Sequence, residues 1–220
     1  MSVVLYNLVT AALMVLMIKL GQRLAPDRTG LPWLAIVVTT LLVAGLVLQA
    51  GWSGATEALD SDPSKSGWWR PITATFLQNG GFLGDTFNLV TALIVLTLAE
   101  AHWGRLRATV LFVLAILVPH WIDLLAGGGA VSHQARNWVG SSGTMYFLGA
   151  TLAAGLVLAR VELRVRLLAL ALPAAGLASW FLQDNAHGLV TAEGFAFGLL
   201  VAVALQVFRG GRALRARALA

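Results

Sequence analysis

Residues 140–159 read GSSGTMYFLGATLAAGLVLA, a stretch of 20 residues without a charged side chain. About 20 apolar residues are enough for a helix to cross the hydrocarbon core of a bilayer. Ser142 lies at the start of the apolar part, between Gly140 and Gly143, which add no side-chain bulk around it. The stretch therefore predicts a membrane-spanning helix over residues 142–159 with a hydroxyl group at its first position.

The rest of the chain repeats this pattern. Of its 220 residues, 58% are hydrophobic and 11% are charged, whereas a soluble domain carries about 25% charged residues. The further predicted spans are residues 3–20, 32–50, 85–101, 106–123, 166–183 and 187–208, and the third could begin earlier because residues 72–83 are also apolar. The first run precedes its basic residues, unlike a cleavable signal peptide. We expect an all-α, polytopic transmembrane helical bundle without a soluble domain.

The longest connection, residues 51–84, contains Trp52, Trp68 and Trp69. Tryptophan side chains favour the membrane–water interface. We therefore expect this segment to be a loop in the outer headgroup region.

The basic residues predict the orientation. With the first span running inward, twelve of the fifteen Lys and Arg residues lie in inner segments: Lys19, Arg23, Arg28, Arg105, Arg107, Arg160, Arg164, Arg166, Arg209, Arg212, Arg215 and Arg217. Basic residues concentrate in cytoplasmic loops, so this bias predicts a cytoplasmic carboxyl terminus. It also accounts for the net charge of +5 without a nucleic-acid partner. Ser142 and His187 then both begin spans at the outer face.

A serine and a histidine at one membrane depth are the minimal parts of a nucleophile and its base. At a helix start, unpaired backbone N–H groups and the helix dipole favour negative charge, so the Ser142 amide could stabilise an oxyanion. Gly194 and Gly198 form a small-residue pair below His187 that permits close contact with a neighbouring helix. No carboxylate is placed to orient the imidazole, and Asp184 is interpreted as a loop or capping residue. The prediction is a dyad.

Other chemistries have less support. The chain has no cysteine, which excludes thiolate chemistry. His120 and Asp123 are one turn apart, but two ligands without a third and without His-Glu-x-x-His do not predict a zinc protease. No metal and no other cofactor is expected. The isolated Gly-x-Ser-Gly motif is also compatible with a serine that only caps a helix beside packing glycines.

Several short motifs occur together in one order. They are Trp69-Arg70 followed by Thr73, Phe87-Asn88, Glu100 with Gly104, Gly140-Ser141-Ser142-Gly143 with Tyr146 one turn later, and Ala186-His187 with Gly194. In this order the chain resembles the rhomboid family of intramembrane serine proteases over about residues 32–208. Several matches in order are far more specific than any single one.

The resemblance implies a six-helix protease core over residues 32–208, one extra amino-terminal transmembrane helix with a basic cytoplasmic loop over residues 1–31, and a basic cytoplasmic tail over residues 209–220. It implies a serine endopeptidase that cleaves in or near transmembrane segments of other membrane proteins, in a bacterial plasma membrane, with its active site open to the outer face. The bilayer and these substrates are the expected partners; no oligomeric state is indicated.

The resemblance also assigns roles to individual residues. Ser142 would be the nucleophile and His187 the general base and acid, while the Asn88 side-chain amide would bind the oxyanion and Tyr146 would support the imidazole. Gly140 belongs to the serine motif. Gln78 stands near a position where family members often have histidine, and could donate to the oxyanion in its place.

The chain also departs from the family pattern. A second frequent histidine position is occupied by Gly84 or Asp85, and Val190 replaces a small residue one turn after His187, which could hold two helices apart. Glu193 is an unexpected carboxyl group inside a span, interpreted as a functional candidate or as a protonated or paired interface residue. These departures keep open an inactive rhomboid-like protein that binds clients without cleaving them. A small transporter or channel is a third reading, but the internal repeats that would support it are not found.

Overall fold

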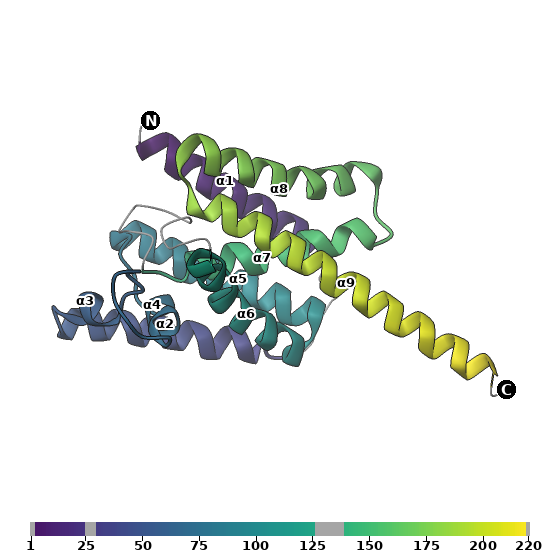
Figure 1. Ribbon diagram of the computed structural model, residues 1–220, viewed down its shortest axis with the longest axis horizontal. Coiled ribbons are helices and arrows are strands. Elements are labelled where there is room, and N and C mark those ends of the chain that lie inside the picture. Colours follow the sequence, from purple (N-terminus) through teal and green to yellow (C-terminus); the bar gives the residue numbers. More distant parts are fainter. Residues whose placement is uncertain (1–2, 25–29, 126–138, 219–220) are drawn as a thin grey trace.

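The described part of the chain is mostly helical. The protein is represented by a computed structural model that describes residues 3–24, 30–125 and 139–218, and these ranges contain no strand. The helices are α1 (Val3–Gln22), α2 (Trp33–Gly51), α3 (Ala55–Leu59), α4 (Arg70–Thr75), α5 (Gly81–Trp103), α6 (Arg105–Leu125), α7 (Ser142–Leu158), α8 (Leu163–Gln183) and α9 (Ala186–Ala218) (Figure 1). The prediction of an all-α protein is confirmed.

Six helices in the described ranges are long and apolar enough to cross a membrane: α1, α2, α5, α6, α8 and α9. They correspond to six of the seven predicted spans, so the chain is an integral membrane protein. The seventh, α7, is also apolar but shorter, with 17 residues. At the other extreme, α9 continues past the predicted end at residue 208 to Ala218 and projects from the bundle (Figure 1).

The short helix α7 forms the centre of the bundle. Every residue from Thr144 to Leu156 is buried, and α1, α5, α6, α8 and α9 all pack against it. A helix that is apolar on all faces is expected inside a bundle. Because neighbouring helices surround α7, its length is not set by the full hydrocarbon thickness, which explains how it can be shorter than the others.

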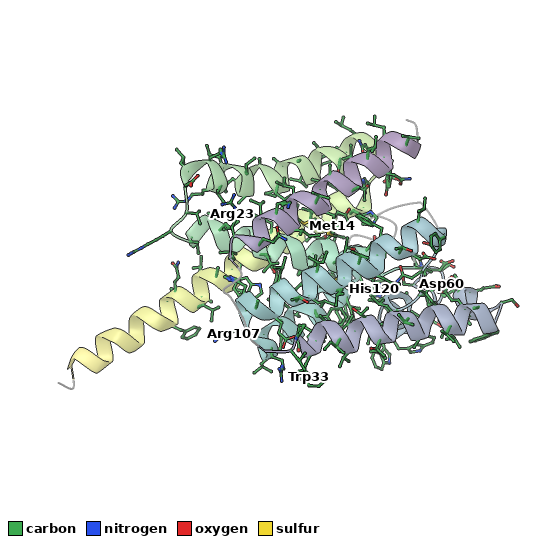
Figure 2. The ribbon with its side chains drawn as sticks, turned by 180° about the vertical axis from the view of Figure 1, so that it is seen from behind. Met14, Arg23, Trp33, Asp60, Arg107 and His120 are labelled. Carbon is green, nitrogen blue, oxygen red and sulfur yellow. The ribbon has the colours of Figure 1, made fainter. Side chains whose placement is uncertain are left out.

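The outer helices present apolar side chains to their surroundings. Val47 on α2 is 67% exposed and Leu182 on α8 is 80% exposed, as expected for helices whose solvent is lipid. Arg23 and Arg107 lie toward one end of the bundle, whereas His120 and Asp60 lie toward the other (Figure 2). The two ends of the bundle therefore differ in chemistry.

The connection between α2 and α5 is more ordered than the predicted loop. It contains the short helices α3 and α4, which pack on each other. Arg70 joins them: its Nη1 donates to the carbonyl oxygens of Ala58 (3.1 Å) and Asp60 (3.0 Å), and it lies 3.4 Å from the Asp60 carboxylate. The third span begins earlier than residue 85, as considered from the sequence, because α5 starts at Gly81; residues 72–80 are not part of it.

Candidate active site

Ser142 and His187 meet at the end of the bundle where α7 and α9 begin. The Ser142 Oγ lies 2.8 Å from the His187 Nε2, a normal distance for a hydrogen bond. Ser142 is the first residue of α7 and His187 is the second residue of α9. The packing of these two helices against each other therefore sets the position of both side chains. The two parts of the predicted dyad are therefore in contact.

Close packing of α9 on both neighbours produces this contact. A Cβ atom added to Gly194 would lie 2.3 Å from the Phe147 carbonyl oxygen on α7. A Cβ atom on Gly188 would lie 2.2 Å from the Gly176 carbonyl oxygen on α8. The glycines thus let the backbone of α9 approach both helices, as small residues do between membrane helices. The sequence predicted the contact through Gly194 but not the one through Gly188.

Val190 does not separate α7 from α9 enough to break the contact. Its side chain is buried, 6% exposed, beside the site. The hydrogen-bond distance between Ser142 and His187 is retained with the valine in place. The expectation that this residue could hold the helices apart is wrong, because the glycine contacts of α9 set the helix separation and Val190 is accommodated beside them.

Tyr146 and Asn185 both contact the imidazole of His187. The Tyr146 ring, one turn below Ser142, packs on it with 4.7 Å between ring centroids and 55° between planes. The Nδ1 atom lies 3.2 Å from the Oδ1 of Asn185, a fully buried residue. Asp184 is the C-cap of α8 with a φ of 50°, in agreement with its interpretation as a capping residue.

Asn185 was missed by the sequence analysis. The geometry adds a third member to the dyad, a neutral amide where serine proteases usually have a carboxylate. A carboxylate is the usual partner of a catalytic histidine, and asparagine is among the commonest residues just before a helix for reasons of capping alone. Its position two residues before His187 was the available signal.

The residues predicted to support an oxyanion form a network beside Ser142. Asn88 Nδ2 donates to Gln78 Oε1 at 2.7 Å, and Gln78 Nε2 donates to Ser141 Oγ at 3.3 Å. The backbone of Gln78 is held by Gln49, whose side chain bonds both its N–H and its carbonyl group. A primary amide has two N–H groups, so the Asn88 amide retains a second donor, and Asn88 and Ser142 both line one cavity.

Gly140 shapes the backbone that leads into α7. Its φ of 129° lies in a region that only glycine adopts without strain. Its N–H donates to the Ala74 carbonyl oxygen on α4 at 3.0 Å, so this amide is occupied and not available to an oxyanion. The first helical hydrogen bond of α7 runs from the Met145 N–H to the Ser141 carbonyl oxygen, at 3.0 Å. By helix geometry the preceding amides, including that of Ser142, have no intrahelical acceptor.

Ser142, His187 and Asn88 open into a cavity of about 760 Å³. Its walls come from α1, α4, α5, α6, α7 and α9 and combine apolar with polar side chains. Cavities of about 300–1,000 Å³ are typical of binding sites. The cavity therefore leaves room for a ligand next to the hydroxyl of Ser142.

His120 and Asp123 on α6 line the same cavity. In the described ranges no group of three or more His, Cys, Asp or Glu residues is arranged to hold a metal ion. Glu193 lies lower on α9, and both its carboxyl oxygens are buried without a hydrogen-bond partner among the described residues. Neither His120 nor Glu193 takes part in the hydrogen bond between Ser142 and His187.

Two other motif residues act at the opposite end of α5. Glu100, 2% exposed, accepts from the Leu34 N–H at 2.9 Å and from Arg105 Nε at 3.0 Å. Gly104 ends α5 with a φ of 81° and donates its N–H to the Glu100 carbonyl oxygen. Glu100 therefore accepts from an amide at the start of α2 and links α5 to both α2 and α6, which is a structural role.

Comparison with known proteins adds no family assignment. No family model, no curated protein and no solved structure matches the chain. The site itself consists of the Ser142 hydroxyl hydrogen-bonded to the His187 imidazole, with the Asn185 amide on the other side of that ring. The start of helix α7 lies beside the hydroxyl. This combination is suited to acyl transfer through a serine nucleophile.

Proposed function

We propose that this protein is an intramembrane serine protease of the rhomboid type, which hydrolyses a peptide bond in or near a transmembrane segment of another membrane protein. The observation that supports this most directly is the 2.8 Å distance between Ser142 Oγ and His187 Nε2 at the mouth of a cavity within a membrane bundle. The ordered motifs in the sequence agree with this assignment, and the site needs no cofactor for the reaction.

The reaction follows from the geometry. Ser142 transfers its hydroxyl proton to His187 Nε2 while its oxygen attacks the substrate carbonyl carbon. His187 then gives that proton to the leaving amine, the carbon–nitrogen bond breaks, and an acyl-enzyme remains on Ser142. A water molecule passes a proton to Nε2 and attacks the ester carbon, and collapse of this second intermediate returns the proton to Ser142 and releases the acid.

The negative charge of each tetrahedral intermediate needs donors. The Ser142 backbone N–H at the start of α7 and the second N–H of the Asn88 side chain are the proposed donors. Gln78 holds the Asn88 amide through its Oε1 and is assigned the role of orienting it. This revises the suggestion that Gln78 itself donates, because Gln78 is buried and, unlike Asn88, does not line the cavity beside Ser142.

The proposed orientation places the active site at the outer face and the carboxyl terminus in the cytoplasm. Ser142 and His187 line one cavity together with His120, and His120 lies toward the end of the bundle opposite to Arg23 and Arg107 (Figure 2). By the distribution of basic residues the end with Arg23 and Arg107 faces the cytoplasm. Substrates would be transmembrane helices that unwind easily near the outer interface, because a helical peptide bond is not accessible to a nucleophile.

The alternative is a client-binding protein that does not cleave. One observation favours it: the Asn88 amide is partly engaged by Gln78, so one proposed oxyanion donor is less available than in an open site. Such a protein would keep the cavity but have a Ser142 that reacts no faster than an ordinary serine.

A cleavage assay with the full chain in proteoliposomes separates these functions. The substrate is a labelled model transmembrane helix containing small and helix-destabilising residues near its outer end. Ser142→Ala and His187→Ala should each abolish cleavage and labelling by a fluorophosphonate probe, since removal of either member of a serine–histidine pair costs several powers of ten in rate. Ser53→Ala, at an exposed serine outside the site, is the control and should cleave like the wild type. Wild-type protein that is neither active nor labelled would support the client-binding alternative.

A further inference from the structure

The first helix contributes a side chain to the active site. Thr10 lies halfway along α1, and its Oγ1 accepts a hydrogen bond from Asn185 Nδ2 at 2.9 Å. The backbone carbonyl of the same residue accepts a hydrogen bond from the Tyr146 hydroxyl. Tyr146 and Asn185, which contact the His187 imidazole, are thus both bonded to one residue of α1. Thr10 also lines the cavity into which Ser142 opens.

The hydrogen-bond network determines which way the Asn185 amide points. The Thr10 hydroxyl donates its single proton to the Tyr6 carbonyl oxygen at 2.8 Å, so toward Asn185 it can only accept. The end of the amide that faces Thr10 must therefore be the NH₂ group. The other end faces the backbone N–H of His187 at 3.2 Å, which can only donate. Both ends give the same answer: the amide oxygen points at His187.

This orientation selects a tautomer of the imidazole. The same Asn185 Oδ1 lies 3.2 Å from His187 Nδ1 and accepts only if Nδ1 carries the proton. With the proton on Nδ1, the lone pair of Nε2 faces the Ser142 hydroxyl at 2.8 Å, as a general base requires. A reversed amide would present N–H to Nδ1 and favour the opposite tautomer, which cannot accept the Ser142 proton.

We propose that Thr10 and Asn185 are positioning residues that keep His187 in its Nδ1–H tautomer, and that α1 is thereby a working part of the active site and not only a membrane anchor. The catalytic consequence rests on the proposed protease function, whereas the tautomer itself does not. In this arrangement a change in the packing of α1 alters the base without touching Ser142 or the substrate.

The first test reads the tautomer directly. Protein labelled with ¹⁵N-histidine is examined by NMR at a pH where His187 is neutral, because the protonated and unprotonated ring nitrogens have well separated shifts. The chain has four histidines, and loss of signals in His187→Ala identifies those of His187. The expected wild-type signals are those of Nδ1–H. An Nε2–H imidazole in the wild type would overturn the proposal.

Substitution of Thr10 tests whether its hydroxyl group fixes the orientation of the Asn185 amide. Thr10→Val keeps the shape of the side chain but removes the acceptor for Asn185, so a mixture of tautomers is expected, while Thr10→Ser should retain Nδ1–H. Thr40→Val is the matched control, because Thr40 makes the same hydroxyl-to-carbonyl bond within the exposed face of α2. Thr10→Val with unchanged signals would overturn the role of Thr10.

A rescue variant separates amide orientation from general damage. In Thr10→Val/Asn185→Asp the carboxylate presents an oxygen to His187 whichever way it turns, so the Nδ1–H tautomer should return. A mixture that persists in the double variant would overturn the mechanism, since loosened packing of α1 would then explain the effect of Thr10→Val.

Kinetics connect the tautomer to the proposed reaction. Thr10→Val should lower the maximal rate of Ser142 acylation by the fluorophosphonate about three- to tenfold, the factor expected from one hydrogen bond, without changing the probe concentration at half-maximal rate. Thr10→Ser should acylate at nearly the wild-type rate. If wild-type Ser142 is never acylated, the protease function fails while the NMR result still decides the positioning.

Discussion

The contact between Ser142 and His187 should be sensitive to a single methyl group placed between α7 and α9. Gly194→Ala adds a Cβ atom that would lie 2.3 Å from the carbonyl oxygen and 2.6 Å from the Cα of Phe147. Both are backbone atoms within a helix and cannot rotate away. The two helices must therefore separate, or the alanine must distort the turn of α9 that carries it.

The size of the effect follows from these distances. Ordinary contact begins near 3.4 Å, so the helices must part by about 1 Å, and the 2.8 Å distance between Ser142 and His187 would grow toward that of a broken hydrogen bond. A displacement of about 1 Å at a catalytic group costs about 100-fold in rate. Overpacking of this kind also destabilises the fold by about 1–3 kcal/mol.

A graded comparison tests this explanation. Gly198→Ala meets the Thr151 Cα at 2.5 Å, but it lies about 6 Å further down α9, so it should destabilise to a similar degree and reduce cleavage less. Ala196→Val adds bulk to the exposed face of the same helix and should change neither property. Cleavage rates in proteoliposomes and thermal unfolding in detergent provide the two measurements. A Gly194→Ala protein that cleaves within about twofold of the wild type would refute the view that close packing of α9 aligns the site.

Three further outcomes are expected. Glu100→Ala should destabilise the bundle by about 2 kcal/mol in thermal unfolding, because it leaves the buried Leu34 N–H without its acceptor, and activity per folded molecule should hold; loss of activity without loss of stability would contradict this structural role. Arg70→Lys, which cannot reproduce the contacts of the guanidinium with Ala58 and Asp60, should speed hydrogen exchange over residues 55–75 and leave α5 unchanged. Asn88→Ala should lower the acylation rate about 100-fold with little change in substrate affinity; an unchanged rate would remove Asn88 from the oxyanion site.

Much of the architecture could be predicted because it depends on local composition. Runs of apolar residues near the length of a bilayer span predict membrane helices, and six of these are confirmed. The Gly194 and Gly198 pair correctly predicted the face of α9 that meets α7. The internal order of residues 52–80 was not predicted, since α3 and α4 are short and depend on the contacts of Arg70 with distant carbonyl groups.

In the candidate site, too, some residues could be predicted from the local sequence and others depend on contacts with distant residues. Ser142 and His187 were identified from motifs and from their common position at helix starts. Asn185 was not identified, although it lies two residues from His187, because its amide matters only after Thr10 on α1 has determined how it points. Thr10 and Asn185 are 175 residues apart in the chain, and no local pattern connects them.

The sequence alone therefore determined which segments enter the membrane, which ends of them carry polar groups, and which helix face has room for a neighbour. These are properties of single helices, set by hydrophobicity and by the 3.6-residue period. Only the tertiary structure decided that a hydroxyl and an imidazole 45 residues apart lie 2.8 Å from each other, and that α1 helps to hold them. Such a distance depends on the rotation, tilt and separation of several helices at once, and these follow from side-chain and backbone packing that no single helix specifies.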